Sequence, residues 1–428
     1  MTTRTPKQPL PKILAPDLIM PTMENIVTEL RRVRDQVARD IQPSEACFDN
    51  AIKPLIDVEN RTQGEVGVIT MLRYAAPEEE ARAASEEACK LWSQGESAFK
   101  AREDVYLIVE APLSAEAAKY LHTLFLDFRR AGHGLLNPEQ IQEYAQRMLR
   151  IEELERQYNQ NLRDEDEAIF FRGEELKENT TTRKTLWVTS EKKVQLNCDI
   201  FKKTMVLRDE NARLLGYESH AAFRVEKKVT KTPERVLALM DSLEEALMPR
   251  GEAEMNELLT LRRKYLSGSG ETTDSMSSWD YSYYTRIAEE NLGLDQTEIS
   301  EYFPLEYTVG AMLDIFASFL QLRFERLASL PEEHRWHEDV MAWSVWDERE
   351  GADDAFVGYL YADLLSRPNK YQGNQNVNLQ CGFAKDDGSR LYPATILMCS
   401  FTPPTSSGCA LLKHHEVVTL FHGKLAHV

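Results

Sequence analysis

Residues 410–428 read ALLKHHEVVTLFHGKLAHV and hold four of the nine histidines of this 428-residue chain: His414, His415, His422 and His427. The leucine, valine and phenylalanine pattern of this segment predicts a helix that leads into His422. Neutral imidazole is the commonest zinc ligand, and zinc enzymes use histidine pairs one helical turn apart. Histidine is also favoured at the end of a helix by the helix dipole. The cluster therefore indicates either a metal site or a polar helix end.

The spacing of these histidines is more informative than their number. In the motif H-E-x-x-H, histidines at i and i+4 reach one ion and the glutamate acts as general base. His415–Glu416 begins this pattern, but a threonine stands where the second histidine is needed. His422 is followed by Gly423 and has Ala426 at i+4. His415 and His422 share a face but lie about 10.5 Å apart along the axis, too far for one tetrahedral zinc. The sequence therefore contains no complete H-E-x-x-H.

Upstream of this segment, helical periodicity dominates as far as about residue 336. The pair Asn137–Pro138 supplies a cap and a first-turn proline before a stripe of apolar residues that runs to Leu162. Apolar spacing also predicts a helix over residues 26–37. Another helix is predicted from residue 233, with Pro249 expected to end or kink it and a further helix expected over about 252–266. These patterns predict a mainly α protein.

Short apolar, aromatic and β-branched runs replace this periodicity after residue 336. They cover residues 341–346, 356–365 and 395–401, and turn residues bound them. We expect these runs to form one small, late β-sheet. His337 and Glu338 precede it but lack partners at metal-ligand spacing, so structural hydrogen bonds are expected of them.

Composition excludes several classes of protein. The formal charge of −19 makes a nucleic-acid partner improbable, because phosphate binding needs clustered Lys and Arg. The six cysteines form no CxxC pair, which argues against a zinc ribbon or disulfide framework. No run approaches a membrane span, and the proline-rich start fits neither a secretory signal nor an amphipathic transit peptide. A cytoplasmic location is therefore expected, in preference to the mitochondrial intermembrane space, with no membrane partner.

The run over residues 410–422 closely resembles the approach to the zinc motif of the thimet oligopeptidase and saccharolysin-like zinc metallopeptidases, peptidase family M3. In that family F-H-E-[FL]-G-H follows, and here the match stops at His422. The resemblance extends in order over about residues 208–422 through LGYESHAA (215–222), EYFP (301–304), WHEDV (336–340), GYLYAD (358–363) and LQCGF (379–383).

The resemblance implies a zincin-like helical clam-shell whose narrow channel admits short peptides, and a monomer. It implies an N-terminal helical region over 1–175 and an incomplete catalytic region over 176–428, in which 416–428 would enter the zinc-motif helix. Between 176 and 208 the chain looks shorter than the family. The C-terminal part, with the third zinc ligand, is expected to be missing.

The same resemblance assigns a role to each residue of the interrupted motif. His422 corresponds to the first zinc ligand, Gly423 stands where the catalytic Glu is expected, and Ala426 replaces the second histidine. His427 could replace that ligand only if the helix ended directly after His422. Zn²⁺ is therefore the family's cofactor, but we expect this chain not to hold it stably and to be inactive. GKLAHV (423–428) is interpreted as the product of a read-through intron, frameshift or alternative exon. A non-catalytic peptide-binding protein or pseudo-peptidase is the alternative.

Overall fold

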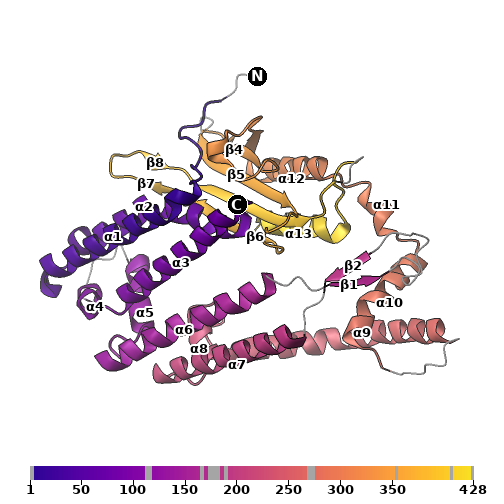
Figure 1. The fold of residues 1–428 in the computed structure, drawn as a ribbon, viewed down its shortest axis with the longest axis horizontal. Coiled ribbons are helices and arrows are strands. Elements are labelled where there is room, and N and C mark those ends of the chain that lie inside the picture. The colour runs from indigo at the N-terminus through magenta and orange to yellow at the C-terminus, as the bar shows by residue number, and fades with distance from the viewer. Residues whose placement is uncertain are drawn as a thin grey trace. The chain divides into compact units, whose positions relative to one another are not determined.

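The computed structural model describes residues 4–110, 118–163, 168–171, 184–187, 191–267, 275–351, 355–404 and 408–425. Helices account for most of it, and a small sheet forms late in the chain, as Figure 1 shows. This confirms the predicted mainly α class. The chain divides into two compact units, which are described separately. The first comprises Met1–Val33, Pro54–Trp92 and Ala246–Val428, and the second Arg34–Lys53 and Ser93–Glu245.

The first unit is built on a five-stranded sheet in the order β3-β4-β5-β9-β6. Neighbouring strands are antiparallel except β5 and β9, which are parallel and pair Tyr361 with Ile396. A small hairpin, β7–β8, follows β6 along the chain. The strands are β3 (Leu322–Arg326), β4 (Met341–Asp347), β5 (Phe356–Leu365), β6 (Gln375–Gln380), β7 (Phe383–Ala384), β8 (Arg390–Leu391) and β9 (Ala394–Phe401).

Helices cover both faces of this sheet because β5 and β9 are apolar on both sides. On one face, Tyr361 and Ile396 pack with buried residues of α1 (Pro16–Asp40), α2 (Lys53–Ala75) and α3 (Glu79–Lys100). On the other face, Leu360 and Leu397 pack with α12 (Leu305–Leu320) and α13 (His414–Leu425). The alternation along β5 thus matches the period of two expected of a strand. The predicted strands at 341–346, 356–365 and 395–401 are confirmed.

Polar or short strands escaped prediction. β6 (QNVNLQ) and β3 (LRFER) lack the apolar alternation of a half-buried strand. Both are edge strands, where polar side chains face solvent. Two further strands, β1 (Ala168–Phe171) and β2 (Lys184–Trp187), pair antiparallel in the second unit.

Two helix boundaries differ from those predicted, in both cases at a proline. α1 begins at Pro16 and contains Pro21, because Ile19 and Met23 extend its buried stripe toward the N-terminus. α9 (Pro233–Leu266) continues through Pro249 instead of ending there. Residues 237–257 of α9 are exposed, so water can bond the carbonyl that the proline leaves without a donor.

The second unit is helical apart from the β1–β2 pair. Asn137 caps α6 as predicted, since its Oδ1 accepts a 2.9 Å hydrogen bond from the Gln140 amide. The helices of this unit are α4 (Glu103–Glu110), α5 (Ala118–Arg130), α6 (Pro138–Arg163), α7 (Glu191–Leu214) and α8 (His220–Val225), with short turns at Pro43–Glu45 and Phe48–Ile52. α1, α3 and α9 each continue from one unit into the other. α10 (Ser278–Asn291), α11 (Gln296–Ser300) and the turn Glu332–His334 belong to the first.

The two compact units do not divide the chain in the same way as the predicted regions 1–175 and 176–428. Each unit combines more than one stretch of sequence. The boundary predicted between residues 175 and 176 lies among 172–183, outside the described ranges, and stays a prediction. Within those ranges no helix is both long and apolar enough to cross a membrane.

Candidate functional site

Helix α13, which carries His422, is held on the sheet by its apolar face. Leu420 is fully buried, and the ring of Phe421 lies 6.2 Å from that of Phe316 on α12. At the start of the helix, Glu416 Oε2 accepts a 2.7 Å hydrogen bond from the Lys413 amide and caps the first turn. These contacts fix which way each residue of α13 faces.

His422 and Gly423 face different surroundings on this helix. His422 is exposed, while Gly423 is turned toward β9. A Cβ atom at position 423 would lie 2.6 Å from Leu397 Cδ1. Leu397 therefore occupies the space that a side chain at this position would need. Ala426 and His427, the other two residues singled out by the sequence, lie outside the described residues.

The described residues do not fit a catalytic zinc site. His415 and His422 both lie on α13 but are two turns apart. In the part of the chain that the structure describes, no three His, Cys, Asp or Glu side chains come close enough to hold one metal ion. Catalytic zinc takes three protein ligands and a water. Among the described residues, His415 therefore lies too far along α13 to share a zinc ion with His422.

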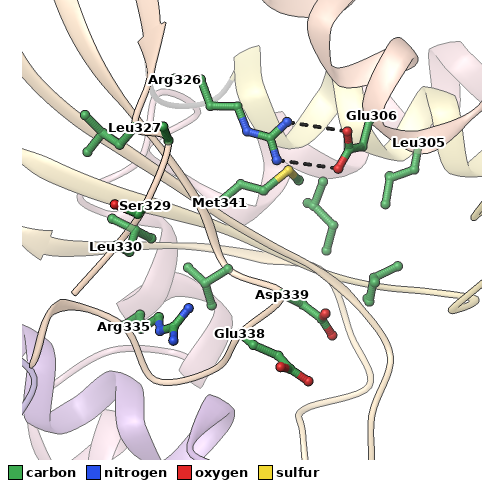
Figure 2. Close-up of a pocket in the computed structure, with 14 residues that line it drawn as sticks. Leu305, Glu306, Arg326, Leu327, Ser329, Leu330, Arg335, Glu338, Asp339 and Met341 are labelled. Atoms are coloured by element: carbon green, nitrogen blue, oxygen red, sulfur yellow. Dashed lines mark hydrogen bonds and ion pairs between the residues drawn. The ribbon is translucent and has the colours of Figure 1, made fainter. Parts of the chain in front are cut away.

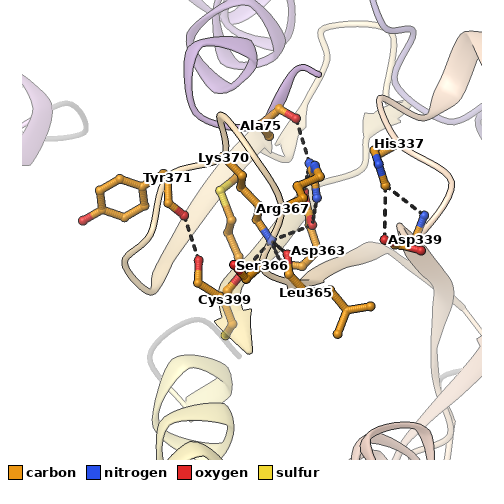
Figure 3. Close-up of polar contacts among 12 residues, drawn as sticks. Ala75, His337, Asp339, Asp363, Leu365, Ser366, Arg367, Lys370, Tyr371 and Cys399 are labelled. Atoms are coloured by element: carbon orange, nitrogen blue, oxygen red, sulfur yellow. Dashed lines mark hydrogen bonds and ion pairs between the residues drawn. The ribbon is translucent and has the colours of Figure 1, made fainter. Parts of the chain in front are cut away.

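A buried ionic cluster lies at the end of β5 and is shown in Figure 3. Asp363 receives hydrogen bonds from Arg367 Nη1 at 2.6 Å and from Lys370 Nζ at 2.7 Å. Burial by itself would raise the pKa of Asp363, but the two cations lower it below the ordinary value. Burial lowers the pKa of Lys370, against the opposing effect of the Asp363 carboxylate.

This cluster ties four separate segments together. Trp336 Nε1 donates to Asp363 Oδ2 at 2.8 Å, and Arg367 Nη2 donates to the Ala75 carbonyl at 2.7 Å. Lys370 Nζ also donates to the Cys399 carbonyl of β9 at 2.6 Å. The sequence signal was an aspartate inside the apolar strand GYLYADLL, but its partners are remote or in a loop. The cluster therefore stabilises the packing of these four segments at the end of β5.

A cavity of about 390 Å³ lies between the N-terminus of α12 and the ends of β3 and β5. Its wall combines leucines with charged side chains, and Figure 2 shows the Arg326–Glu306 ion pair on one side of it. Next to it, His337 Nδ1 accepts a 3.2 Å hydrogen bond from the Asp339 amide, the structural kind of role that the sequence indicated. The same expectation was wrong for Glu338, whose exposed side chain makes no hydrogen bond within the described residues. Sequence reasoning did not find this cavity, because its wall is assembled from four separate segments.

Comparison with known proteins shows which family the chain resembles. The sequence model described as "Peptidase family M3" matches residues 175–427. Saccharolysin of Saccharomyces cerevisiae is 26% identical to the chain, over 97% of this chain and 65% of its own length. Oligopeptidase A of Escherichia coli is 25% identical over 97% of this chain and 67% of its own length. A thimet-like oligopeptidase of Dictyostelium discoideum is 25% identical over 90% of this chain and 64% of its own length.

The chain thus spans about two thirds or less of the curated relatives named above. The match of the family model over more than half of its residues is nevertheless decisive. On this evidence the chain belongs to peptidase family M3.

Proposed function

We propose that this chain has the fold of a zinc peptidase that acts on short peptides but does not itself hydrolyse them. Its membership of family M3 supports the first part, as do relatives named oligopeptidase A and thimet-like oligopeptidase. The single observation that carries the second part is the environment of residue 423. A glycine stands beside His422, and Leu397 fills the space next to it.

The loss of an acidic residue at this position has a defined chemical consequence. A positioned general base contributes about 10²–10⁴-fold to the rate of a proton-transfer step. Glycine offers no such group, and on α13 the acidic residue Glu416 is occupied with capping the helix. A peptide that reached His422 would find no carboxylate at the next position of this helix to take a proton from water.

His422 is the residue that we propose as a metal ligand. It is exposed on a helix that is anchored by Leu420 and Phe421, so its imidazole is accessible. One imidazole that Gly423 and Ala426 follow in the sequence does not make a catalytic zinc site. We expect zinc to bind weakly and without the geometry that hydrolysis requires. The cytoplasmic location and the monomeric state remain predictions from sequence.

Hydrolysis of a quenched fluorescent short peptide tests this proposal. The purified chain is assayed with added zinc, with and without 1,10-phenanthroline, next to a His422→Ala variant as the matched control. We expect the chain and the variant to show the same background, insensitive to the chelator. Cleavage by the chain that phenanthroline abolishes and that His422→Ala lacks would refute the proposal. Saturable binding of the intact peptide without cleavage would support the peptide-binding alternative.

A further inference from the structure

The cavity beside α12 has the volume of a small-molecule site. Its volume of about 390 Å³ lies at the lower end of the range of about 300–1,000 Å³ found for ligand pockets. Leu330, Val340 and Leu364 line it and are each at least nine-tenths buried. They give the cavity an apolar wall that an aliphatic or aromatic side chain of a ligand could cover. All of the lining residues belong to the first compact unit.

Some of the charged side chains around the cavity already contact another group of the protein. The guanidinium of Arg326 pairs with the carboxylate of Glu306 at 3.4 Å. The carboxylate of Asp339 lies 3.4 Å from the ring of His337. These groups are not free to pair with a ligand without losing a contact that they now make.

Arg335 and Glu338 differ from these pairs. Among the described residues, neither side chain has a hydrogen-bond or ion-pair partner. Figure 2 shows both side chains on the segment that precedes β4, across the cavity from the Arg326–Glu306 pair. One unpaired, half-buried cation and one unpaired, exposed carboxylate therefore stand at the same side of the cavity.

This arrangement selects the charge pattern of the ligand. Arg335 is half-buried and Glu338 is exposed, so each can meet an opposite charge on a ligand that lies at the mouth of the cavity. An anion would use only Arg335, and a cation would use only Glu338. A zwitterion satisfies both, because guanidinium binds carboxylate in a bidentate fashion and carboxylate binds ammonium.

We propose that this cavity binds a small zwitterion that carries an apolar side chain, either a free apolar α-amino acid or a dipeptide. Arg335 binds its carboxylate, Glu338 binds its ammonium group, and Leu330, Val340 and Leu364 contact its side chain. The cavity shares no residue with α13, so the proposal is independent of whether His422 holds a metal or the chain cleaves peptides.

Isothermal titration calorimetry on the full chain tests the charge pattern with ligands alone. Leucine and Leu-Leu are the two zwitterionic probes. The one that binds more tightly shows whether the cavity takes a free amino acid or a dipeptide. We expect one saturable site. Loss of one charged contact is expected to weaken binding at least about tenfold, so the N-acetylated and the amidated forms of the better probe should both bind that much less tightly. Glycine or Gly-Gly, which lack the apolar side chain, should also bind more weakly.

Paired variants then assign each charge to its residue. Arg335→Gln should weaken the better probe and remove the difference between its acid and amide forms. Glu338→Gln should remove the difference between its free and acetylated forms. Arg390→Gln and Glu332→Gln carry the same charge changes at exposed positions outside the cavity and should bind as the unmodified chain does. Absence of saturable binding by either zwitterion up to about 10 mM would overturn the proposal. Equal binding of the capped forms by the unmodified chain would also overturn it.

Discussion

Replacing Lys370 by Met is the most demanding test of whether the buried ionic cluster stabilises the end of β5. The ammonium group of Lys370 is fully buried and donates to Asp363 Oδ1 and to three backbone carbonyl oxygens, those of Asp363, Leu365 and Cys399. Methionine fills a similar volume with an apolar chain, so packing changes little while all four polar contacts, which share the three N–H donors of the ammonium group, are lost. The variant thus isolates the polar contribution of one side chain.

The size of the effect follows from what remains around Asp363. Removing one partner of a buried ion pair typically destabilises a protein by about 3–5 kcal/mol. Here Asp363 keeps the hydrogen bonds from Arg367 and from Trp336, so its charge is not left bare. We therefore expect a loss near the lower end, about 3 kcal/mol. That loss lowers the urea midpoint by about 1 M for a slope of about 3 kcal/mol/M.

Urea unfolding followed by tryptophan fluorescence measures this loss, since Trp336, Trp343 and Trp346 all lie in or beside the sheet. Lys385→Met is the matched control, because Lys385 is exposed in the turn between β7 and β8. It should change the free energy of unfolding by no more than about 0.5 kcal/mol. A loss below about 1 kcal/mol for Lys370→Met, with an unchanged slope, would refute the role assigned to the cluster.

Two further predictions concern the contact of helix α2 with strand β6 and a buried histidine. Gly67→Ala on α2 should destabilise by about 2 kcal/mol or more in urea unfolding, because its Cβ would lie 2.3 Å from the Leu379 carbonyl oxygen. Gly310→Ala on α12, with nothing within 4 Å, should instead stabilise by up to about 1 kcal/mol, and the same sign for both variants would contradict the packing described. In the second unit, burial lowers the pKa of His133, whose Nε2 lies 2.9 Å from the Lys100 carbonyl oxygen. The unfolded chain therefore binds a proton that the folded chain does not as pH falls below about 6.5, so stability is lost in that window, and His133→Phe should reduce the difference between unfolding midpoints at about pH 7.5 and about pH 5.5.

Local sequence signals predicted the elements whose ends are fixed by the chain itself. α6 begins where Asn137 and Pro138 indicate, because both act within one turn. The predicted end of the helix at Pro249 was wrong because the carbonyl one turn before a proline can bond water when the helix is exposed. Sequence alone does not show that exposure. β6 was missed because its residues are polar and its position is fixed by pairing with β9.

The candidate site follows the same rule: the order of residues along the chain was predictable, and contacts between separate segments were not. The order of residues on α13 showed that Gly423 follows His422, and this needs no structure. The contact of Gly423 with Leu397 depends on packing a helix onto a strand, so spacing along the chain could not reveal it. Arg335 and Glu338 drew attention only after the structure placed them beside leucines from other segments.

The zinc content of the purified chain tests the central claim most directly. The chain and its His422→Ala variant are equilibrated with excess zinc, passed through a desalting column and analysed by inductively coupled plasma mass spectrometry. The account predicts that both retain far less than one zinc ion per chain, because His422 with Gly423 and Ala426 beside it supplies a single ligand. One tightly held zinc ion per chain, lost in His422→Ala, would contradict it.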